Sequence, residues 1–308
     1  FIKSEIVLII SFVLALASAF IVKPSAEYID YIDFRTLALL FCLMAVMAGL
    51  GRLGIFKLLA EKMLKLSGST RSLCLVLSLL CFFSSMLITN DVALITFVPF
   101  SIVTLHISGK EKLLIPLVTI ETVAANLGSM LTPIGNPQNL YLYTKFQIPA
   151  MEFVGIMAVP FVLAMLLITL CCFIFVKPEP FELKDEKICL PVGRSVVYLL
   201  LFILAIAIVF RGIPYMVGLA VIPSVLLFID RKALKMVDYP LLLTFVFFFI
   251  FSGNMARIDG VRSLFSFLLE KNTFLVSILS CQVISNVPSA ILLSQFTDNY
   301  KQLLLGVN

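Results

Sequence analysis

The sequence predicts an all-α polytopic membrane protein with inverted repeats, each containing a re-entrant hairpin and a broken transmembrane helix. Composition is the first observation, because 61% of the 308 residues are hydrophobic and 13% are charged, against roughly 25% charged residues in soluble domains. The second is a series of apolar segments, each close to the roughly 20 residues that a bilayer requires. The third is a cluster of Gly, Pro and Asn residues that interrupts one apolar segment.

The long apolar segments predict membrane-spanning helices joined by short loops. These spans lie near residues 5–22, 35–51, 153–176, 195–210, 213–229 and 240–253. Residues 55–68 place apolar side chains at helical spacing among lysines, which predicts a helix lying in the membrane interface. Most basic residues fall in the segments that this arrangement places in the cytoplasm, as the positive-inside rule requires.

The chain divides into four consecutive parts. It starts at Phe1 without a Met, and we expect it to lack residues at both ends. The parts are a first transmembrane helix and loop (1–34), a first inverted repeat (35–176), a cytoplasmic loop (177–194) and a second inverted repeat, incomplete at its C-terminus (195–308). We expect a multi-pass protein of the cell membrane, inner or plasma.

The segment 70–110 consists of two apolar arms that flank Thr89, Asn90 and Asp91. Two full crossings would place Asp91 in a minimal turn outside the bilayer. A re-entrant hairpin that enters from the cytoplasm places the tip near the midplane, where the N-terminus of the second arm presents unpaired N–H groups. The distribution of basic residues favours the hairpin.

The segment 113–144 begins as an apolar helix and then stops being one. Helix-breaking and polar residues crowd its middle: Gly128, Ser129, Thr132, Pro133, Gly135, Asn136, Pro137, Gln138 and Asn139. In lipid each unpaired backbone group costs several kcal/mol, so irregular backbone persists there only where it is buried in protein or lines a polar cavity. The pattern therefore indicates an ion or substrate site on a discontinuous helix.

The two halves of the chain resemble each other across the polar segment 177–194. Residues 33–49 correspond to 238–253, and the tip at 88–93 corresponds to the tip at 284–290. The spans between the tips place the second hairpin on the opposite side of the membrane, which makes the repeat an inverted one. Asn308 aligns with Asn126 of the first broken helix.

These tips and this break resemble those of the ion transporter superfamily, and within it the citrate-transporter-like permeases, which include divalent-anion/sodium symporters and arsenite efflux pumps. The resemblance begins at about residue 30 and is most specific at 89–91, 126–139 and 285–290. It implies a site formed by two re-entrant hairpins and two unwound helices, with an elevator-like movement that carries the substrate. The first tip is closer to the Asn-Asp tip of arsenite-type pumps than to the Ser-Asn-Thr tip of dicarboxylate symporters.

By position, the resemblance implies a first coordination region at Asn90, Asn126, Gly128, Thr132 and Pro133, and a second at Ser285, Asn286 and Asn308. The full set of candidate substrate- or ion-binding residues is Thr89, Asn90, Asp91, Asn126, Gly128, Ser129, Thr132, Pro133, Gly135, Asn136, Ser285, Asn286 and Asn308. A coupling sodium ion would lie at Asn90, Asp91 and Asn126. We expect no structural metal and no cofactor.

Two carboxylates are candidate proton sites. An ionised Asp91 inside the membrane costs at least a few kcal/mol unless it holds a cation, takes a proton or meets a partner. The alternative is a carboxylate that caps the N-terminus of the second arm. Glu121, which precedes the break, is either a second proton site or a structural hydrogen-bonding group that faces the hairpin.

The favoured function is secondary active transport of a small anion, a di- or tricarboxylate or a related compound, coupled to a sodium or proton gradient. Alternatives are an arsenite efflux permease, a sodium/proton antiporter of the same fold, and a passive anion channel. An enzyme is not expected, because the chain has one histidine and no recognisable nucleophile–base or metal-binding motif. The expected partners are a small anionic substrate and the lipid bilayer, not nucleic acid, and a homodimer is left open.

Overall fold

The computed structural model of this protein describes residues 5–55, 58, 62, 67–180 and 192–308, which are almost entirely helical. In chain order the elements are α1 (Ile6–Ile21), α2 (Tyr28–Tyr31), α3 (Phe34–Leu53), α5 (Thr70–Ile88), α6 (Asn90–Ile107), η1 (Glu111–Leu113), α7 (Leu114–Gly128), η2 (Ser129–Leu131), α8 (Pro137–Lys145), α9 (Ala150–Phe175), α10 (Val192–Val209), α11 (Tyr215–Ile229), α12 (Arg231–Lys235), α13 (Tyr239–Ala256), α14 (Asp259–Ile284), α15 (Asn286–Leu293) and α16 (Tyr300–Gly306). The prediction of an all-α protein is confirmed.

Six helical segments in the described part of the chain are long and apolar enough to cross a membrane: Phe34–Leu53, Thr70–Ile88, Glu111–Leu131, Ala150–Phe175, Tyr239–Ala256 and Asp259–Ile284. Large apolar side chains on the outer face of α9, including Val159, Leu163 and Leu167, are exposed. Such a surface suits lipid rather than water. The protein is therefore a multi-pass membrane protein. Of the six spans predicted from hydropathy, α3, α9 and α13 are among these long helices, whereas α1, α10 and α11 form at the predicted places as shorter apolar helices.

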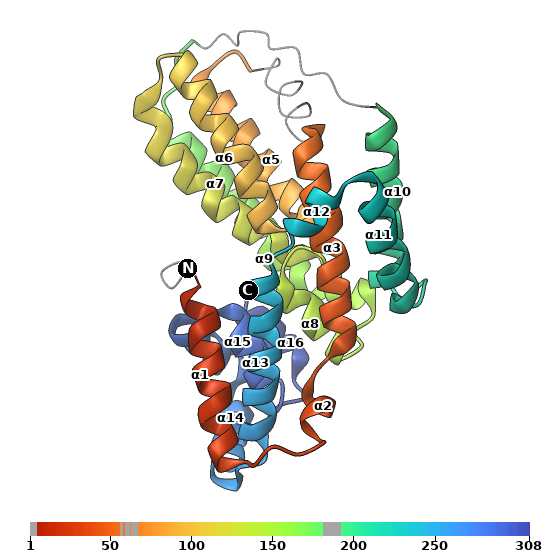
Figure 1. Cartoon of the computed structure of the whole chain (residues 1–308). Coiled ribbons are helices and arrows are strands. Elements are labelled where there is room, and N and C mark those ends of the chain that lie inside the picture. The colour runs from red at the N-terminus through yellow and green to blue at the C-terminus, as the bar shows by residue number, and fades with distance from the viewer. Residues whose placement is uncertain (1–4, 56–57, 59–61, 63–66, 181–191) are drawn as a thin grey trace.

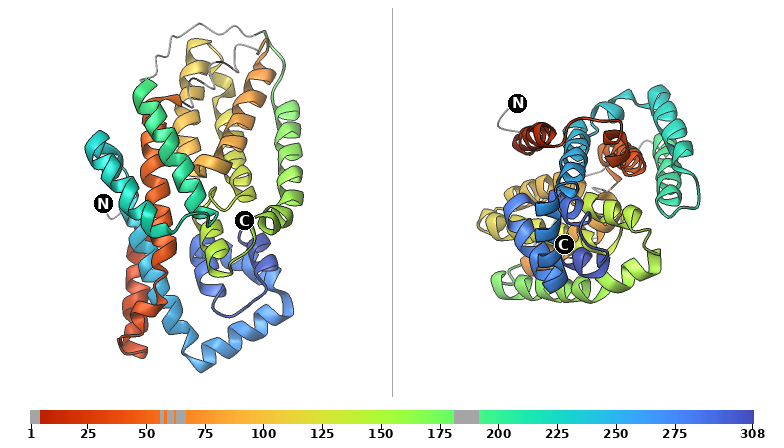
Figure 2. Two further views of the ribbon diagram at one scale, coloured as in Figure 1. Left: turned by 90° about the vertical axis from the view of Figure 1, so that its right-hand side faces the viewer. Right: turned by 90° about the horizontal axis from the view of Figure 1, so that it is seen from below.

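The helices pack as two groups (Figures 1 and 2). We call α1–α3 and α10–α13 the frame layer, and α5–α9 with α14–α16 the tip layer. Within the tip layer, α5, α6 and α7 form one end of the molecule and α14, α15 and α16 the other (Figure 1). Both hairpins therefore belong to the same layer, and they approach the middle of the molecule from opposite ends.

Matching backbone features support the predicted repeat. Asp33 caps the N-terminus of α3 by accepting a hydrogen bond from the Thr36 backbone N–H, and Asp238 caps α13 in the same way through Leu241. At the two tips, Thr89 and Ser285 adopt nearly the same conformation, with φ of 70° and 73°. The repeat accounts for all four positions, whereas its inversion across a membrane and the re-entry of the hairpins stay predictions.

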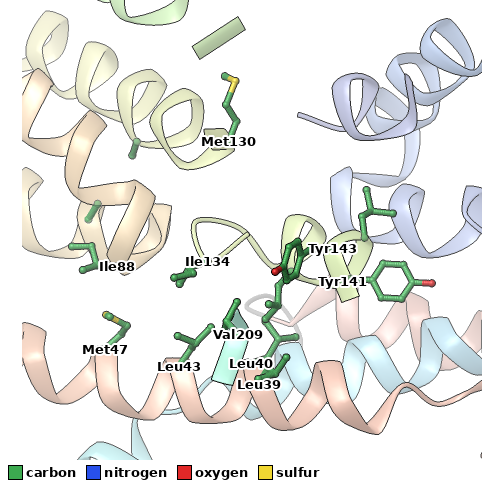
Figure 3. Packing of buried hydrophobic residues seen from close by; sticks show 14 of the residues in the cluster. Leu39, Leu40, Leu43, Met47, Ile88, Met130, Ile134, Tyr141, Tyr143 and Val209 are labelled. Atoms are coloured by element: carbon green, nitrogen blue, oxygen red, sulfur yellow. The ribbon is translucent and has the colours of Figure 1, made fainter. Parts of the chain in front are cut away.

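The largest buried apolar cluster joins the two layers. In Figure 3, Leu39, Leu43 and Met47 of α3 lie on one side of the interface, and Ile134 with Tyr141 and Tyr143 of α8 lie on the other. The aromatic rings of Tyr141 and Phe249 continue this contact, with centroids 5.5 Å apart. Because lipid is as apolar as these side chains, close van der Waals packing holds the layers together rather than exclusion of water.

Some predicted features fall on residues that the structure does not describe. The interfacial helix at 55–68 and the loop at 177–194 lie largely outside the described residues, as does Cys189. The described cysteines are free thiols, and Cys42, Cys74, Cys81 and Cys172 are buried. This placement is typical of cysteines that act as small hydrophobic residues.

Candidate functional site

The first tip is a sharp turn in which one residue separates two helices. α5 ends at Ile88 and α6 begins at Asn90, leaving Thr89 with φ 70° and ψ 153°. This region of backbone conformation is normally reserved for glycine and costs of order 1–3 kcal/mol. No side chain caps α6, so its first N–H groups remain available to a ligand. Strained backbone held in place by its surroundings is frequent at binding sites.

The break in the next helix occurs where the sequence predicts it. α7 ends at Gly128, a 3-10 turn follows at Ser129–Leu131, and Thr132 is extended before α8 begins at Pro137. Pro133 has no N–H to donate, and the residue before a proline favours the extended conformation that Thr132 adopts, so proline and its neighbour together favour the break. The carbonyl groups freed by the break therefore need partners from elsewhere.

Asn139 supplies several of those partners. Its side chain is buried, and its Nδ2 lies 3.2 Å from the carbonyl oxygen of Met130, 3.3 Å from that of Thr132 and 3.5 Å from that of Ser129. The Thr132 hydroxyl in turn donates to the carbonyl oxygen of Met86 in α5. These contacts attach the broken helix to itself and to the first hairpin.

Close backbone contact accounts for the glycines of the break. A Cβ atom on Gly128 would lie 2.0 Å from the carbonyl oxygen of Phe82, and one on Gly135 would lie 2.1 Å from that of Ser129. Both distances are far shorter than a van der Waals contact, so only glycine fits. Gly128 thus allows α7 to approach α5, and Gly135 allows the unwound segment to fold back on itself.

Asn90 and Asn126 meet directly. Asn90 Nδ2 donates to Asn126 Oδ1 over 3.0 Å, while Asn126 Nδ2 donates to the Thr122 carbonyl oxygen one turn earlier. The Oδ1 atom of Asn90 is buried and accepts no hydrogen bond from the described residues. An unpaired buried acceptor is costly, and amide and carbonyl oxygens are the ligands that hard cations prefer. The pair is therefore suited to bind a cation.

Asp91 lines a pocket to which neither Asn90 nor Asn126 contributes. It is exposed and accepts no hydrogen bond from the described residues, so it does not cap α6 as the alternative interpretation required. With Thr89 and Pro137 it lines a pocket of about 470 Å³ that also contains Asp238 of the frame layer. The structure thus brings Asn90 and Asn126 together, whereas Asp91 lines a pocket between the layers with two further carboxylates, Asp238 and Glu5.

The second tip repeats the backbone of the first but not its contacts. Ser285 and Asn286 are exposed, and within the described residues no hydrogen bond joins them to Asn308. Asn308 instead donates to Asn139 Oδ1 over 2.7 Å and to the Leu304 carbonyl oxygen. Of the residues predicted for the second region, Asn308 is therefore not hydrogen-bonded to the tip among the described residues but connects to Asn139 of the first broken helix.

Glu121 lies inside the bundle of α5, α6 and α7. It is 0% exposed, and its Oε1 accepts a hydrogen bond of 2.5 Å from Ser101 of α6, while Oε2 has no partner among the described residues. The hydrogen bond to the facing hairpin, one of two interpretations of Glu121, is present. A carboxyl with no cation beside it at this depth is stable only when it carries a proton.

Sequence reasoning did not include Asn139 among the candidate site residues, although it counted Asn139 among the residues that break the helix. The available signal was the surplus of freed carbonyl groups in the segment 129–136, which require donors. Asn139 is the buried amide that follows this segment in the first turn of α8. Its bond to Asn308, 169 positions away in the sequence, has no local signal.

Comparison with known proteins identifies relatives of this chain. A family model described as citrate transporter matches residues 2–302, which include both tips and the break. An uncharacterized transporter of Methanocaldococcus jannaschii is 35% identical over 251 residues, which are 80% of this chain and 68% of that protein. The inner membrane protein YbiR of Escherichia coli is 31% identical over 275 residues, 84% of this chain and 70% of that protein.

Proposed function

Because this chain belongs to the citrate transporter family and is a membrane transporter, we propose that it carries out secondary active transport of small anions of the di- or tricarboxylate class. A sodium or proton gradient drives the transport. We place the protein in the inner or plasma membrane of the cell, as the name of its Escherichia coli relative suggests. The substrate class rests on the description of the family and on the chemistry of the site.

The observation that carries this proposal is the pocket at the first tip. The N-termini of α6 and α8 both border it, through Thr89 and Pro137, and neither helix has a side-chain cap. Helix N-termini bind anions through free N–H groups and the positive end of the helix dipole. Yet Asp91 and Asp238 line the same pocket, and no Lys or Arg does so among the described residues.

Helix N-termini and carboxylates in one pocket explain why transport of an anion would be coupled to a cation or proton. An anion that enters the pocket is repelled by Asp91 until a proton or a cation neutralises the carboxylate. The unpartnered Oδ1 of Asn90 offers a second place for positive charge beside the same tip. Cation and anion then each increase the affinity for the other, which is coupling in the thermodynamic sense.

An elevator-like movement of the tip layer against the frame layer would carry the substrate. Among the described residues their interface is mainly apolar, and its directional contacts include the hydrogen bond from Ser252 of α13 to the Ile291 carbonyl oxygen of α15 and those from Arg211 to the carbonyl oxygens of Tyr143 and Gln147. A surface of this kind can slide without breaking many hydrogen bonds. We therefore assign the movement to the layer that holds both tips.

A second candidate function is exchange of a cation, or efflux of arsenite, against protons. The observation that favours it is that Asp91, Asp238 and Glu5 line one pocket, because three carboxylates with no Lys or Arg among the described lining residues attract cations. In this alternative Asp91 binds either the exported cation or a proton, but not both. The anion-binding helix termini would then have no role in the reaction.

Uptake into proteoliposomes tests the proposal. The purified protein is reconstituted, and uptake of labelled citrate, succinate and arsenite is measured under imposed sodium and pH gradients. Uptake of a carboxylate that exceeds equilibration and depends on one gradient is the expected result. Proton-linked movement of arsenite or sodium, without carboxylate uptake, would replace the proposal by the second candidate. Carboxylate flux that never exceeds equilibration would indicate a channel.

A further inference from the structure

A chain of hydrogen bonds runs from the first tip to the second broken helix. Asn90 Nδ2 donates to Asn126 Oδ1 over 3.0 Å, and the hydroxyl of Ser129 donates to the Asn126 carbonyl oxygen over 2.7 Å. Asn139 Nδ2 lies 3.5 Å from the Ser129 carbonyl oxygen, and Asn139 Oδ1 accepts from Asn308 Nδ2 over 2.7 Å. All five members are neutral, so a change at one end reaches the other through hydrogen-bond geometry rather than through charge.

Both ends of this chain carry an unsatisfied oxygen. The Oδ1 atoms of Asn90 and Asn308 are buried and accept no hydrogen bond from the described residues. The two residues come from opposite halves of the sequence, and Asn308 aligns with Asn126 in the repeat. Because a buried acceptor without a donor is costly, each end is prepared to receive a cation or a donor group from a ligand.

In this series of hydrogen bonds, Asn139 is the side chain that connects the first half of the sequence to the second. Its buried amide uses its nitrogen on the first broken helix, at the carbonyl oxygens of Met130 and Thr132, and its oxygen on Asn308. The amide nitrogen and oxygen cannot move independently of each other, because the amide group is planar and rigid. A displacement of the carbonyl groups at the first break therefore rotates the acceptor that holds Asn308.

We propose that Asn139 is the positioning residue that couples the two halves of the transport site, so that binding of the coupling ion at the Asn90 end sets the affinity for ligand at the Asn308 end. This inference rests on the proposed function, since it presupposes ion-coupled anion binding. Asn139 itself touches neither ion nor substrate. It acts by orienting Asn308 and the carbonyl groups of the break.

The test uses Asn139→Asp and Asn308→Asp. The Asp at position 139 keeps the acceptor for Asn308 but loses the donor to the broken helix, whereas the Asp at position 308 loses the donor to Asn139. Asn299→Asp is the matched control: Asn299 caps α16 by accepting from the Gln302 N–H in an exposed position, and aspartate does the same. Size-exclusion profiles and thermal unfolding without ions establish that each variant folds.

The measured quantity is the factor by which sodium ions or protons increase the affinity of the purified protein for labelled citrate or succinate. Such coupling factors are typically about 5- to 150-fold. We expect both variants at the Asn139–Asn308 contact to reduce this factor at least about fivefold, while affinity at saturating ion changes less and Asn299→Asp matches the wild type. A merely structural role would lower thermal stability and leave the coupling factor unchanged.

Two results would overturn the inference, and they are distinguishable. If the wild type shows ion-dependent anion binding and both variants keep its coupling factor within about twofold, the inference alone is wrong. If the wild type binds neither carboxylate under any ion condition, the proposed function is wrong and the inference falls with it. Should Asn139→Asp fail to fold, the coupling factor of Asn308→Asp decides, because that variant leaves the bonds of Asn139 to the broken helix intact.

Discussion

The two hairpin tips have the same backbone and different side-chain contacts. Thr89 and Ser285 share a positive φ, and each is followed by an asparagine that begins a helix. At the first tip that asparagine, Asn90, is half-buried and bonded to Asn126. At the second tip Asn286 is exposed. Asn308, which corresponds to Asn126 by alignment, donates a hydrogen bond to Asn139 instead.

The repeat preserves the backbone conformation of the tips, whereas the side-chain contacts differ between the two halves. Backbone strain at the tip depends on a turn of one residue, so both halves retain it. Amide contacts depend on which side chains meet across the packed helices, and here the two halves differ, because Asn90 bonds to Asn126 whereas Asn308 bonds to Asn139. A molecule whose two half-sites are unequally assembled is suited to alternate between them, as a transporter requires. Four pairs of substitutions, with one member of each pair in each half, test this comparison.

The largest effect is expected where each broken helix passes the first arm of its hairpin. Gly128→Ala would place a Cβ 2.0 Å from the Phe82 carbonyl oxygen, and Gly306→Ala would place one 2.5 Å from Ser277 Cβ. We expect losses in the free energy of unfolding of about 3 kcal/mol and about 2 kcal/mol respectively, since overpacking costs roughly 1–3 kcal/mol or more. Denaturation in mixed micelles measures both values.

Gly155→Ala in α9 is the control, because a Cβ there meets nothing within 4 Å. Alanine in this exposed helical position favours the helix by up to about 1 kcal/mol. A Gly128→Ala protein as stable as this control would show that α7 and α5 do not approach each other as closely as the structure has it.

The next effect concerns charge, which only the first tip carries. Asp91→Asn should reduce ion-driven uptake about tenfold, equivalent to about 1.4 kcal/mol, and should leave thermal stability unchanged because Asp91 is exposed and makes no hydrogen bond with described residues. Val287 occupies the corresponding position of the second tip, and Val287→Ala should change uptake less than about twofold. Unchanged ion-driven uptake in Asp91→Asn would remove Asp91 from the coupling mechanism.

Relief of backbone strain should affect both tips alike. Thr89→Gly and Ser285→Gly should each raise the free energy of unfolding by about 1 kcal/mol, with the larger gain at Thr89 because its side chain is β-branched. Thr89→Ala keeps the positive φ without the freedom of glycine and should show no gain. Equal stability of the glycine and alanine variants in thermal unfolding would mean that the tip is not strained.

The smallest effect tests the amide contact itself. Asn90→Ala removes the hydrogen bond to Asn126 and should lower the free energy of unfolding by about 0.5 to 1 kcal/mol, the net contribution of a neutral hydrogen bond. Asn286→Ala, at an exposed position, should change it by less than about 0.5 kcal/mol. Equal losses for the two variants would indicate that the second tip is also paired in solution.

Much of this site was predictable because its chemistry is local. Pro133, Gly135 and Pro137 stand close together with several polar residues, and such a cluster disfavours a regular helix more strongly than a single proline or glycine, so the break at residues 129–136 follows from the residues themselves. The tip residues Asn90 and Asn286 are recognisable because polar residues between two apolar arms are costly in lipid unless they form a turn or line a polar cavity. The contact of Asn90 with Asn126 agrees with the expectation that the hairpin and the broken helix meet.

Other features of the site could not be predicted from local sequence. Asp91 is a candidate because a carboxylate inside a membrane needs a cation, a proton or a partner, but the sequence does not show that Asp91 lines a pocket with Asp238. For Glu121 the sequence leaves two roles open, and its hydrogen bond with Ser101 depends on how the bundle packs. Each of these depends on which residue of a distant helix lies opposite.

The sequence by itself determined that this chain is helical and lies in a membrane, where its helix is broken and where its tips lie, because hydropathy and the chemistry of Gly, Pro and Asn act within a few residues. Only the tertiary structure decided that Asn139 joins the two halves through Asn308 and that Asp91 shares a pocket with Asp238. The physical reason is that such contacts depend on how far and at what angle packed helices lie from one another, and one local pattern is compatible with many such arrangements.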